Sequence, residues 1–586
     1  MSNSNVKKNQ CSSEKEVKGN NSPSKMCGAR FIAETFKGYG VTHIFYVEAI
    51  LRRALVEMEK LGIRRILTHS EKAAAYMADG YARVSRRPGI CMSQSVGAAN
   101  LASGLQDPYL GLSPVIALTG RRTPIAQHRN AYQEILHSPI FEPVTKYNVI
   151  VETLEQLPYL LRQAFREATS GAPGPVHLDV MGNLGEELAE AEADLEMIVE
   201  GRFTHYPSMR PEPEAECVEE AMRFLEKAEQ PVIVAGGGAI TSSAGPEIVE
   251  FAEMLSIPVA TSLNGKGTIL ESHPLSVGVV GSYSRWCANR VVSEADLVLF
   301  IGSHTGDQVT NNWKVPQIGT PVIQVDIDPV ELGRSYPNTV GVMGDAKTTV
   351  RRFIEFIKNK SRTRHQWALR AQQLVKEWQN EFEPLRNSNA SPIRVERLCG
   401  ELTNILPSNA ILVSDTGYAA IWTGTMVYLT HPGQTYIRAA GSLGWAIPAS
   451  LGAKCAAPKR PVICFVGDGG FWYHLSELET ASRCGIKTVT VVNNNHCLRQ
   501  CLEGINRAYG DEPGNRGEMC MFQEVNFARI AQEMGCLGIR VERSGEISEA
   551  LKKALMSDQP AVVDIVTDVN CKAPAPWAPS YKKLKV

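Results

Sequence analysis

Several features that point to particular classes of protein are missing from this sequence. No apolar run is long enough to span a bilayer, and residues 1–25 lack the apolar core of a signal peptide. The 61 basic and 62 acidic residues leave a formal net charge of −1, so no basic excess favours binding to nucleic acid. No basic amphipathic stretch favours a membrane surface either. We therefore expect a cytoplasmic protein that binds neither nucleic acid nor membranes.

The 14 cysteines are scattered and form no Cys-x-x-Cys pair of the kind that binds metals. In a chain this long they are typical of reduced thiols in the cytosol rather than of a disulfide framework. Cys497 and Cys501 could share a helix face, but two unpaired thiols are the favoured interpretation. Residues 1–25 are polar, so we expect a disordered tail; the acidic Glu14 and Glu16 argue against a transit peptide.

Short apolar runs alternate with helical patterns along most of the chain. THIFYV and RRILTHS have the composition of strands, and ILRRALVEMEKLG between them has the apolar spacing of a helix. This alternation predicts an α/β fold with parallel sheets, and 586 residues correspond to about three domains. We predict three consecutive doubly wound domains at residues 26–195, 212–360 and 375–572, with tails at 1–25 and 573–586. The predicted strands and helices alternate in a similar way in the first and third domains, which a duplicated ancestor would explain.

The segment ICFVGDGGFWYHLSELETASRCGIKTVTVVNNNH carries the strongest chemical signal. It has the pattern of a strand, a Gly-rich turn, a helix, a second strand and an Asn-rich turn. Both turns would lie at the carboxyl ends of parallel strands, where open α/β sheets bind ligands, so we expect Asp468 and Asn494 at one edge. Mg²⁺ prefers oxygen ligands and often keeps diphosphate oxygens among them. We predict a Mg²⁺ site made by Asp468, Asn494 and the backbone carbonyl of His496; two tight turns of an ordinary sheet are the alternative.

Glycines in the first of these turns suit a phosphate group. Gly467, Gly469 and Gly470 allow the backbone to approach a phosphate closely, and they leave N–H groups free at the start of the next helix. We expect all three to contact a diphosphate.

These motifs resemble the signature of thiamine-diphosphate enzymes, and most closely that of the acetohydroxyacid synthase-like group. Gly467-Asp468-Gly469 matches its Gly-Asp-Gly, and Asn493-Asn494 matches the Asn-Asn that follows some two dozen residues later. The resemblance covers nearly all of the three predicted domains. It implies thiamine diphosphate and Mg²⁺ as cofactors, with a first domain that binds the pyrimidine, a central domain, and a third domain that binds the diphosphate.

A glutamate at the start of a predicted helix is the expected catalytic residue. The segment THSEKAAAYMADGYAR resembles the pyrimidine-domain motif of this group, whose catalytic Glu corresponds to Glu71. In this family a carboxyl group beside the pyrimidine promotes removal of a proton from the thiazolium ring by the cofactor's own amino group. Without this context, a Glu after the possible N-cap Ser70 would be explained by the helix dipole alone.

Two further segments resemble cofactor-binding loops of the family. GSLGWAIPASLGA places the backbone of Gly441 toward the pyrimidine and Leu443 where a bulky side chain supports the bent cofactor, although a core leucine is equally compatible. SDTGYAA resembles the other diphosphate loop, with Gly417, Tyr418 and Ala419 as candidates. Two chains share each site in this family, so the resemblance implies a homodimer or homotetramer with sites at the subunit interface.

The residues that would face the substrate depart from the family. Where a Gly-Gly turn usually follows the first strand of the pyrimidine domain, this chain has Glu48, which either acts as an acid or base or is simply exposed. Arg121 stands where those synthases have a Gln and could pair with a substrate carboxylate. Tyr132 and Gln133 resemble the family's aromatic–Gln pair. Glu503 lies nearest to a tryptophan position that favours a larger acceptor, in a polar stretch that could close over the site as a mobile lid.

The central domain carries weaker signals of a nucleotide site. PVIVAGGGAI has a Gly-rich turn after a strand, and PVIQVDIDPVELG resembles the part of acetohydroxyacid synthases that binds FAD, so Asp326 or Asp328 could meet a ribose. Those synthases have an Arg-rich segment where this chain has Ser303-His304-Thr305. FAD is therefore one possibility, and a vestigial or differently occupied domain is the other.

The leading hypothesis is a lyase or transferase that acts on a small 2-oxo acid or related carbonyl compound. It would decarboxylate this substrate and join the remainder to a second carbonyl, as acetolactate synthases do. One alternative uses the same cofactor for simple decarboxylation, hydrolysis of a 1,2-dione or cleavage of an acyl-CoA. Another is a non-catalytic relative that binds nucleotide, and the retention of Glu71 argues against it.

Overall fold

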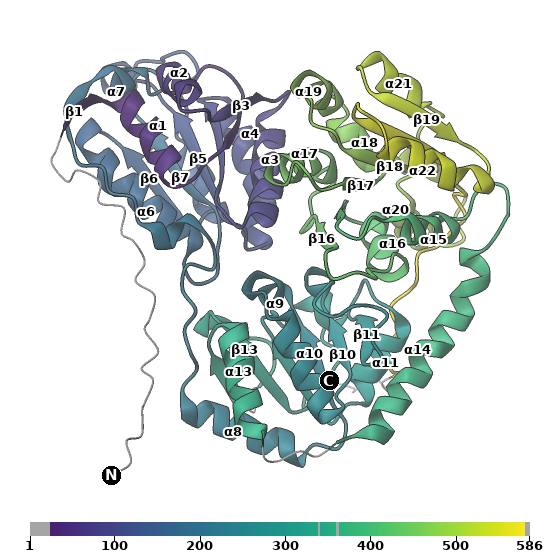
Figure 1. Cartoon of the computed structure of the whole chain (residues 1–586). Helices are drawn as coiled ribbons and strands as arrows, with labels where there is room; N and C mark the ends of the chain where they lie inside the picture. The colour runs from purple at the N-terminus through teal and green to yellow at the C-terminus, as the bar shows by residue number, and fades with distance from the viewer. Residues whose placement is uncertain (1–23, 338–339, 359–362, 581–586) are drawn as a thin grey trace, which may run out of the picture.

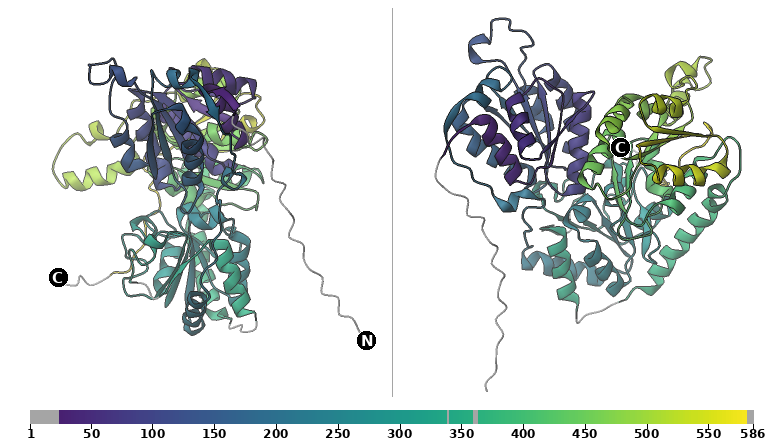
Figure 2. Two further views of the ribbon diagram at one scale, coloured as in Figure 1. Left: turned by 90° about the vertical axis from the view of Figure 1, so that its left-hand side faces the viewer. Right: turned by 45° about the horizontal axis from the view of Figure 1, so that its top comes forward.

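Three α/β domains make up the computed structural model, which describes residues 24–337, 340–358 and 363–580 (Figure 1). Each domain is built around a six-stranded parallel sheet against which helices pack, as the sequence predicted. The first and third domains lie side by side, and the central domain lies beside both of them (Figures 1 and 2). No helix of the described residues is long and apolar enough to cross a membrane.

The sheet of the first domain has the strand order β3-β2-β4-β5-β7-β6. Strands β5 and β7 are buried along their whole length, as expected for parallel strands with both faces covered. The strands are β2 (His43–Tyr46), β3 (Arg64–Leu67), β4 (Gly89–Gln94), β5 (Val115–Gly120), β6 (Tyr147–Val151) and β7 (Val176–Val180). The main helices are α1 (Gly28–Gly38), α2 (Arg52–Lys60), α3 (Glu71–Ser85), α4 (Gly97–Leu110) and α6 (Leu157–Thr169).

The sheet of the central domain has the order β11-β10-β9-β12-β13-β14. Counted along the chain this is 3-2-1-4-5-6, the order of dinucleotide-binding folds, and its switch point lies between β9 and β12. The strands are β9 (Pro231–Ala235), β10 (Val259–Thr261), β11 (Ser276–Val279), β12 (Leu297–Ile301), β13 (Val322–Asp326) and β14 (Val340–Met343). The main helices are α8 (Ala215–Lys227), α9 (Gly237–Ser242), α10 (Gly245–Leu255), α11 (Trp286–Glu294) and α13 (Ala346–Ile357).

The sheet of the third domain has the order β16-β15-β17-β18-β20-β19. Its strands are β15 (Ile411–Ser414), β16 (Thr435–Arg438), β17 (Val462–Gly467), β18 (Val489–Asn494), β19 (Leu537–Val541) and β20 (Ala561–Val566). Its helices are α15 (Val395–Ile405), α16 (Tyr418–Met426), α17 (Ala446–Ala456), α18 (Asp468–His474), α19 (Glu477–Cys484), α20 (Arg499–Tyr509), α21 (Phe527–Glu533) and α22 (Ile547–Leu555). Counted along the chain, the strands of the first and third sheets have the same order, 2-1-3-4-6-5. This agrees with the similar alternation of strands and helices predicted for these two domains.

Segments outside the sheets join the domains. The longest connector is helix α14 (His365–Arg386), which runs along one side of the molecule and leads into the third domain (Figure 1). Near the C-terminus the carbonyl of Trp577 accepts a hydrogen bond of 2.7 Å from Asn289 in the central domain. The expected disordered tail lies outside the described residues except for Ser24 and Lys25. These two depart from the prediction because strand β1 (Ser24–Cys27) pairs antiparallel with β8 (Glu192–Leu195).

The first and third domains meet where α3 packs against α17 (Figure 1). Two glycines permit this contact. A Cβ added to Gly80 would lie 2.1 Å from the carbonyl oxygen of Ala449, and one added to Gly452 would lie 1.9 Å from that of Met77. Neither distance leaves room for a methyl group, so the absence of side chains at these two positions sets how closely the helices approach.

We expect Gly452→Ala to lower the free energy of unfolding by about 1–3 kcal/mol, because the new methyl group must push α3 and α17 apart. Urea-induced unfolding followed by circular dichroism would measure this. Gly545→Ala is a matched control in the same domain, since an added Cβ there meets no atom within 4 Å. A Gly452→Ala variant as stable as the control would contradict the role assigned to this contact.

Candidate active site

The turns after β17 and β18 come together at the carboxyl edge of the third sheet. Gly467 pairs with Asn493 in the parallel ladder, so the residues that follow each strand are neighbours. Asp468 is buried, and its carboxylate accepts backbone N–H groups of Gly469 at 2.6 Å, Asn495 at 3.0 Å and Cys497 at 3.2 Å. Burial raises the pKa of Asp468 to about 6, while the donated hydrogen bonds oppose this rise. The carboxylate thus ties the two turns together.

Asn494 presents an oxygen atom that has no partner. Its side chain is fully buried, and its Nδ2 donates to the carbonyl of Val525 at 3.2 Å and to Asp564 at 2.8 Å. These bonds fix which way the amide faces and leave Oδ1 buried without a hydrogen-bond partner. Buried polar atoms are rarely left unpaired, so this oxygen suits a ligand such as a divalent cation.

His496, the third expected metal ligand, has a left-handed backbone conformation. His496 adopts φ 57°, and its carbonyl already accepts a hydrogen bond of 2.7 Å from the N–H of Phe522. No group of three or more His, Cys, Asp or Glu side chains in the described residues could hold a metal ion. A cation between Asp468 and Asn494 would therefore need further oxygens, from backbone or from a bound anion, as Mg²⁺ commonly has.

The glycines of the site divide into two kinds. A Cβ added to Gly467 or Gly441 would meet nothing within 4 Å, so these two backbone positions face open space that a ligand can enter. A Cβ added to Gly469 would lie 2.4 Å from the side chain of Leu498, and one added to Gly470 would lie 3.0 Å from the carboxylate of Asp415. Gly469 and Gly470 therefore lie against protein side chains rather than against open space.

Asp415 joins two of the predicted cofactor loops. It is buried, and its carboxylate accepts the N–H groups of Thr416 at 2.7 Å, Gly444 at 3.0 Å and Ala446 at 3.4 Å. Burial raises the pKa of Asp415 to about 7, against the effect of these donors. The loop of Gly417, Tyr418 and Ala419 is thereby fixed to the loop of Gly441 and Leu443. The motif SDTGYAA contains Asp415, but nothing in the sequence predicts that its carboxylate joins the two loops.

Glu71 is the first residue of α3, which Ser70 caps by accepting the N–H of Ala73 at 3.1 Å. Its carboxylate is half-buried and accepts a hydrogen bond of 3.2 Å from Asn100 on α4. It also lies against Gly97, where an added Cβ would be 2.3 Å from Oε1. No hydrogen bond or ion pair joins Glu71 to Asp468 or Asn494 within the described part of one chain.

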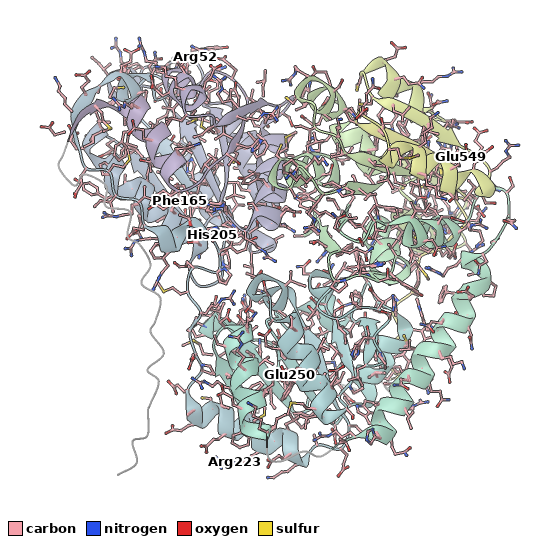
Figure 3. The ribbon with its side chains drawn as sticks, viewed as in Figure 1. Arg52, Phe165, His205, Arg223, Glu250 and Glu549 are labelled. Atoms are coloured by element: carbon pink, nitrogen blue, oxygen red, sulfur yellow. The ribbon has the colours of Figure 1, made fainter. Side chains whose placement is uncertain are left out.

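Glu48 lies in a strained loop after β2. Ala49 has φ 88° and Leu51 has φ 47°, in the left-handed region that favours glycine. The Glu48 side chain is 53% exposed and forms an ion pair of 2.5 Å with Arg52, at the outer edge of the first domain (Figure 3). The loop therefore keeps a backbone geometry typical of glycine although the glycines are absent.

The other predicted substrate residues have mixed environments. Arg121 donates to Gln127 at 3.2 Å and lies 3.6 Å from the buried carboxylate of Asp179. Tyr132 is 75% exposed, and Gln133 has φ 62°. Glu503 forms ion pairs with Arg499 at 3.2 Å and Lys572 at 3.1 Å. Arg121 and Glu503 are thus held by charged partners, whereas the exposed Tyr132 has the Arg122 guanidinium over one face of its ring, 5.9 Å from the centre.

A cavity of about 280 Å³ lies at the switch point of the central sheet. Residues of all three domains line it, among them Gly237, Gly238, His304 and Asp326. The Asp326 carboxylate accepts the N–H of Asp328 at 3.0 Å, and burial raises its pKa. The arginines that line the cavity are Arg83, Arg86 and Arg438.

Each of these arginines already donates to protein acceptors. Arg83 bonds to Asp79 at 2.7 Å, and Arg86 bonds to the carbonyl of Ile240 at 2.9 Å. Arg438 bonds to Asn264 at 2.7 Å and to Gln308 at 2.6 Å. Sequence reasoning found the glycine turn and Asp326 but not the arginines, because Arg83 and Arg438 come from the neighbouring domains.

Comparison with known proteins identifies three matching segments. They match models of the thiamine pyrophosphate enzymes: the N-terminal TPP binding domain at 26–140, the central domain at 218–353 and the C-terminal TPP binding domain at 415–565. A probable acetolactate synthase large subunit of Methanocaldococcus jannaschii is 33% identical over 93% of this chain and 92% of its own length. An acetolactate synthase large subunit of Corynebacterium glutamicum is 30% identical over 93% of this chain and 87% of its own. That of Lactococcus lactis is 29% identical over 92% of both chains.

Proposed function

This chain belongs to the thiamine pyrophosphate enzymes, in the acetolactate synthase-like group, and we propose that it decarboxylates a 2-oxo acid and ligates the remaining fragment to a second carbonyl compound. The bond between the carboxylate and the carbonyl carbon would break with loss of CO₂. A new carbon–carbon bond would form to the acceptor, whose oxygen takes up a proton. The observation that carries this proposal is the buried, unpaired oxygen of Asn494 beside the carboxylate of Asp468.

Asp468 and Asn494 fit a Mg²⁺ ion that binds a diphosphate. A carboxylate oxygen and an amide oxygen lie in adjacent turns, and the backbone carbonyl of His496 is the third proposed ligand. Gly467 leaves the approach to them open. When bound, thiamine diphosphate supplies a nucleophilic carbon that adds to the substrate carbonyl and accepts the electron pair released with CO₂.

The loops tied by Asp415 would hold the organic part of this cofactor. Gly441 is exposed and has open space where a side chain would be, so its backbone is available to the pyrimidine. Leu443 is half-buried in the same loop and would support the cofactor from below. Gly417, Tyr418 and Ala419 line the other side, near the diphosphate. We assign binding and orientation, not proton transfer, to these residues.

Glu71 is the proposed catalytic residue, acting on a cofactor held by a second copy of the chain. Its carboxyl group would hold a proton at Oε1 or Oε2 and share it with the pyrimidine nitrogen. Exposed apolar side chains on both domains support a homodimer or homotetramer: Val96 at the start of α4 is 47% exposed and Tyr473 on α18 is 58% exposed. A second copy would cover these surfaces and complete each site.

The substrate and acceptor are the open part of the proposal. Tyr132 and Gln133 are the candidates for contact with the substrate that have no ion pair within the described residues, while Glu48, Arg121 and Glu503 must first leave theirs. Simple decarboxylation, cleavage of a 1,2-dione and cleavage of an acyl-CoA use the same cofactor chemistry and are the alternatives. Product analysis with pyruvate, benzoylformate, a 1,2-diketone and oxalyl-CoA separates them, and turnover of none would favour the non-catalytic alternative.

FAD is the least supported of the expected cofactors. Asp326 suits a ribose, but each of the three arginines of the central cavity already donates to at least one protein oxygen, so none is reserved for a diphosphate. His304, 45% exposed, stands where the related synthases carry their arginine-rich segment. We therefore infer that this domain is vestigial or binds a different nucleotide.

Glu71→Gln should lower turnover of pyruvate about 100- to 10,000-fold while the protein still binds thiamine diphosphate, because the amide cannot exchange the proton. Steady-state kinetics and calorimetry measure the two properties. Glu57→Gln, on the surface of the same domain, should have the activity of the wild type. Activity of Glu71→Gln close to that of the wild type would refute the assignment.

Asp468→Ala should weaken Mg²⁺-dependent binding of thiamine diphosphate by more than about 100-fold, since it removes a metal ligand and the acceptor that joins the two turns. Isothermal titration calorimetry with and without Mg²⁺ tests this. Asp558→Ala removes a fully exposed carboxylate of the same domain and is the control. Equal affinity in the two variants would contradict the metal site.

Purified protein should show no visible flavin absorbance, because the three arginines that line the central cavity among the described residues are already bonded to protein oxygens. Mass spectrometry of small molecules released by denaturation would identify any nucleotide bound there. A stoichiometric amount of FAD in this extract would overturn the inference.

A further inference from the structure

We propose that Asp107, in the first domain, is a positioning residue for the cofactor loop of residues 438–445 in the third domain of the same chain. This inference rests on the proposed function, because the loop contains Gly441 and Leu443. Asp107 is fully buried on α4. Its carboxylate accepts three successive backbone N–H groups across the domain boundary: those of Ala440 at 2.9 Å, Gly441 at 3.2 Å and Ser442 at 3.1 Å.

An arginine holds this carboxylate and one end of the loop. Arg83 on α3 bonds to Asp107 at 3.1 Å and to Asp79 at 2.7 Å. Another nitrogen of the same guanidinium donates to the carbonyl of Arg438 at 2.7 Å. Arg83 therefore orients both carboxylates and fixes the residue at which the loop leaves β16.

The other end of the loop is held by Asp79. The indole Nε1 of Trp445 donates to the Asp79 carboxylate at 2.9 Å, and the Arg83 guanidinium lies 4.8 Å from the centre of the Trp445 ring. Asp79 and Trp445 are both fully buried. The first domain thus contacts the loop at its start, its middle and its end, through charge-assisted hydrogen bonds in a buried environment.

These contacts leave the other side of the loop for the cofactor. The N–H groups of residues 440–442 point into the first domain, whereas Gly441 is exposed and Leu443 is half-buried. Asp415 holds the same loop from the third domain, through the N–H groups of Gly444 and Ala446. A loop held in its bound conformation before the cofactor arrives loses less conformational entropy on binding, which strengthens affinity.

Only a carboxylate meets the requirements at position 107. Its two oxygens accept three N–H groups and one guanidinium donor. An asparagine has a single acceptor oxygen, and its NH₂ group would face N–H donors that then lose their partner. Asp107→Asn therefore keeps the size of the side chain but leaves one acceptor oxygen where there were two, which weakens the hold on the loop.

The test is hydrogen–deuterium exchange on the protein without cofactor, together with calorimetry of thiamine diphosphate with Mg²⁺. Asp107→Asn should exchange the amides of residues 440–442 faster than the wild type and bind the cofactor at least about tenfold more weakly. Glu396→Gln is the matched control: this buried carboxylate of the third domain pairs with Arg394 at 2.8 Å and does not contact the loop. It should match the wild type in both measurements.

Unchanged exchange at residues 440–442 in Asp107→Asn would overturn the proposal, and so would cofactor affinity equal to that of the control. If Asp107→Asn does not fold, Trp445→Phe tests the hold of the first domain on the loop, because it keeps an aromatic ring while it removes the bond to Asp79 and part of the buried ring system over Arg83. It should increase exchange over residues 440–446 and weaken cofactor binding, and the wild-type result in both would overturn the proposal. Wild-type protein that binds no thiamine diphosphate would refute the proposed function instead, while the exchange experiment would still test the hold of Asp107 on the loop.

Discussion

Three buried carboxylates hold the irregular backbone at the carboxyl edge of the third sheet. The ladder of hydrogen bonds ends at this edge, so the N–H groups of the turns need other acceptors in the interior. Charged acceptors bond more strongly than neutral ones, and a single carboxylate can join N–H groups from separate turns. The carboxylates and the backbone they hold are Asp468 for the turns after β17 and β18, Asp415 for residue 416 and residues 444–446, and Asp107 for residues 440–442.

Burial of these carboxylates is electrostatically unfavourable. Burial raises the pKa of Asp415 to about 7 and that of Asp468 to about 6, so both carboxylates lie in surroundings that disfavour negative charge. The unpaired oxygen of Asn494 adds a further buried acceptor. A divalent cation bound between Asp468 and Asn494 would relieve this cost at those two residues.

The contact between the first and third domains also positions residues at the carboxyl edge of the third sheet. Gly80 and Gly452 let α3 lie directly on α17, and this close approach brings Asp79 and Arg83 to the loop that precedes α17. The same helix begins at Glu71, the proposed catalytic residue. The loop of Glu48 lies at the outer face of the first domain and keeps left-handed backbone at Ala49 and Leu51 without glycine.

The sequence by itself determined the fold class, the three α/β units, and the neighbouring positions of the turns that contain Asp468 and Asn494. These are local signals: apolar periodicity specifies strands and helices, and glycine turns at strand ends have a fixed place in a parallel sheet. The tertiary structure decided which hydrogen-bond partners the buried side chains have. Asp107, Asp564 and Arg83 act on residues far away in the chain, and no spacing rule reveals which buried carboxylate will meet which N–H group. It also showed Arg121 and Glu503 in ion pairs, because the charge of a side chain can be read from sequence but its neighbours are set only when the domains pack.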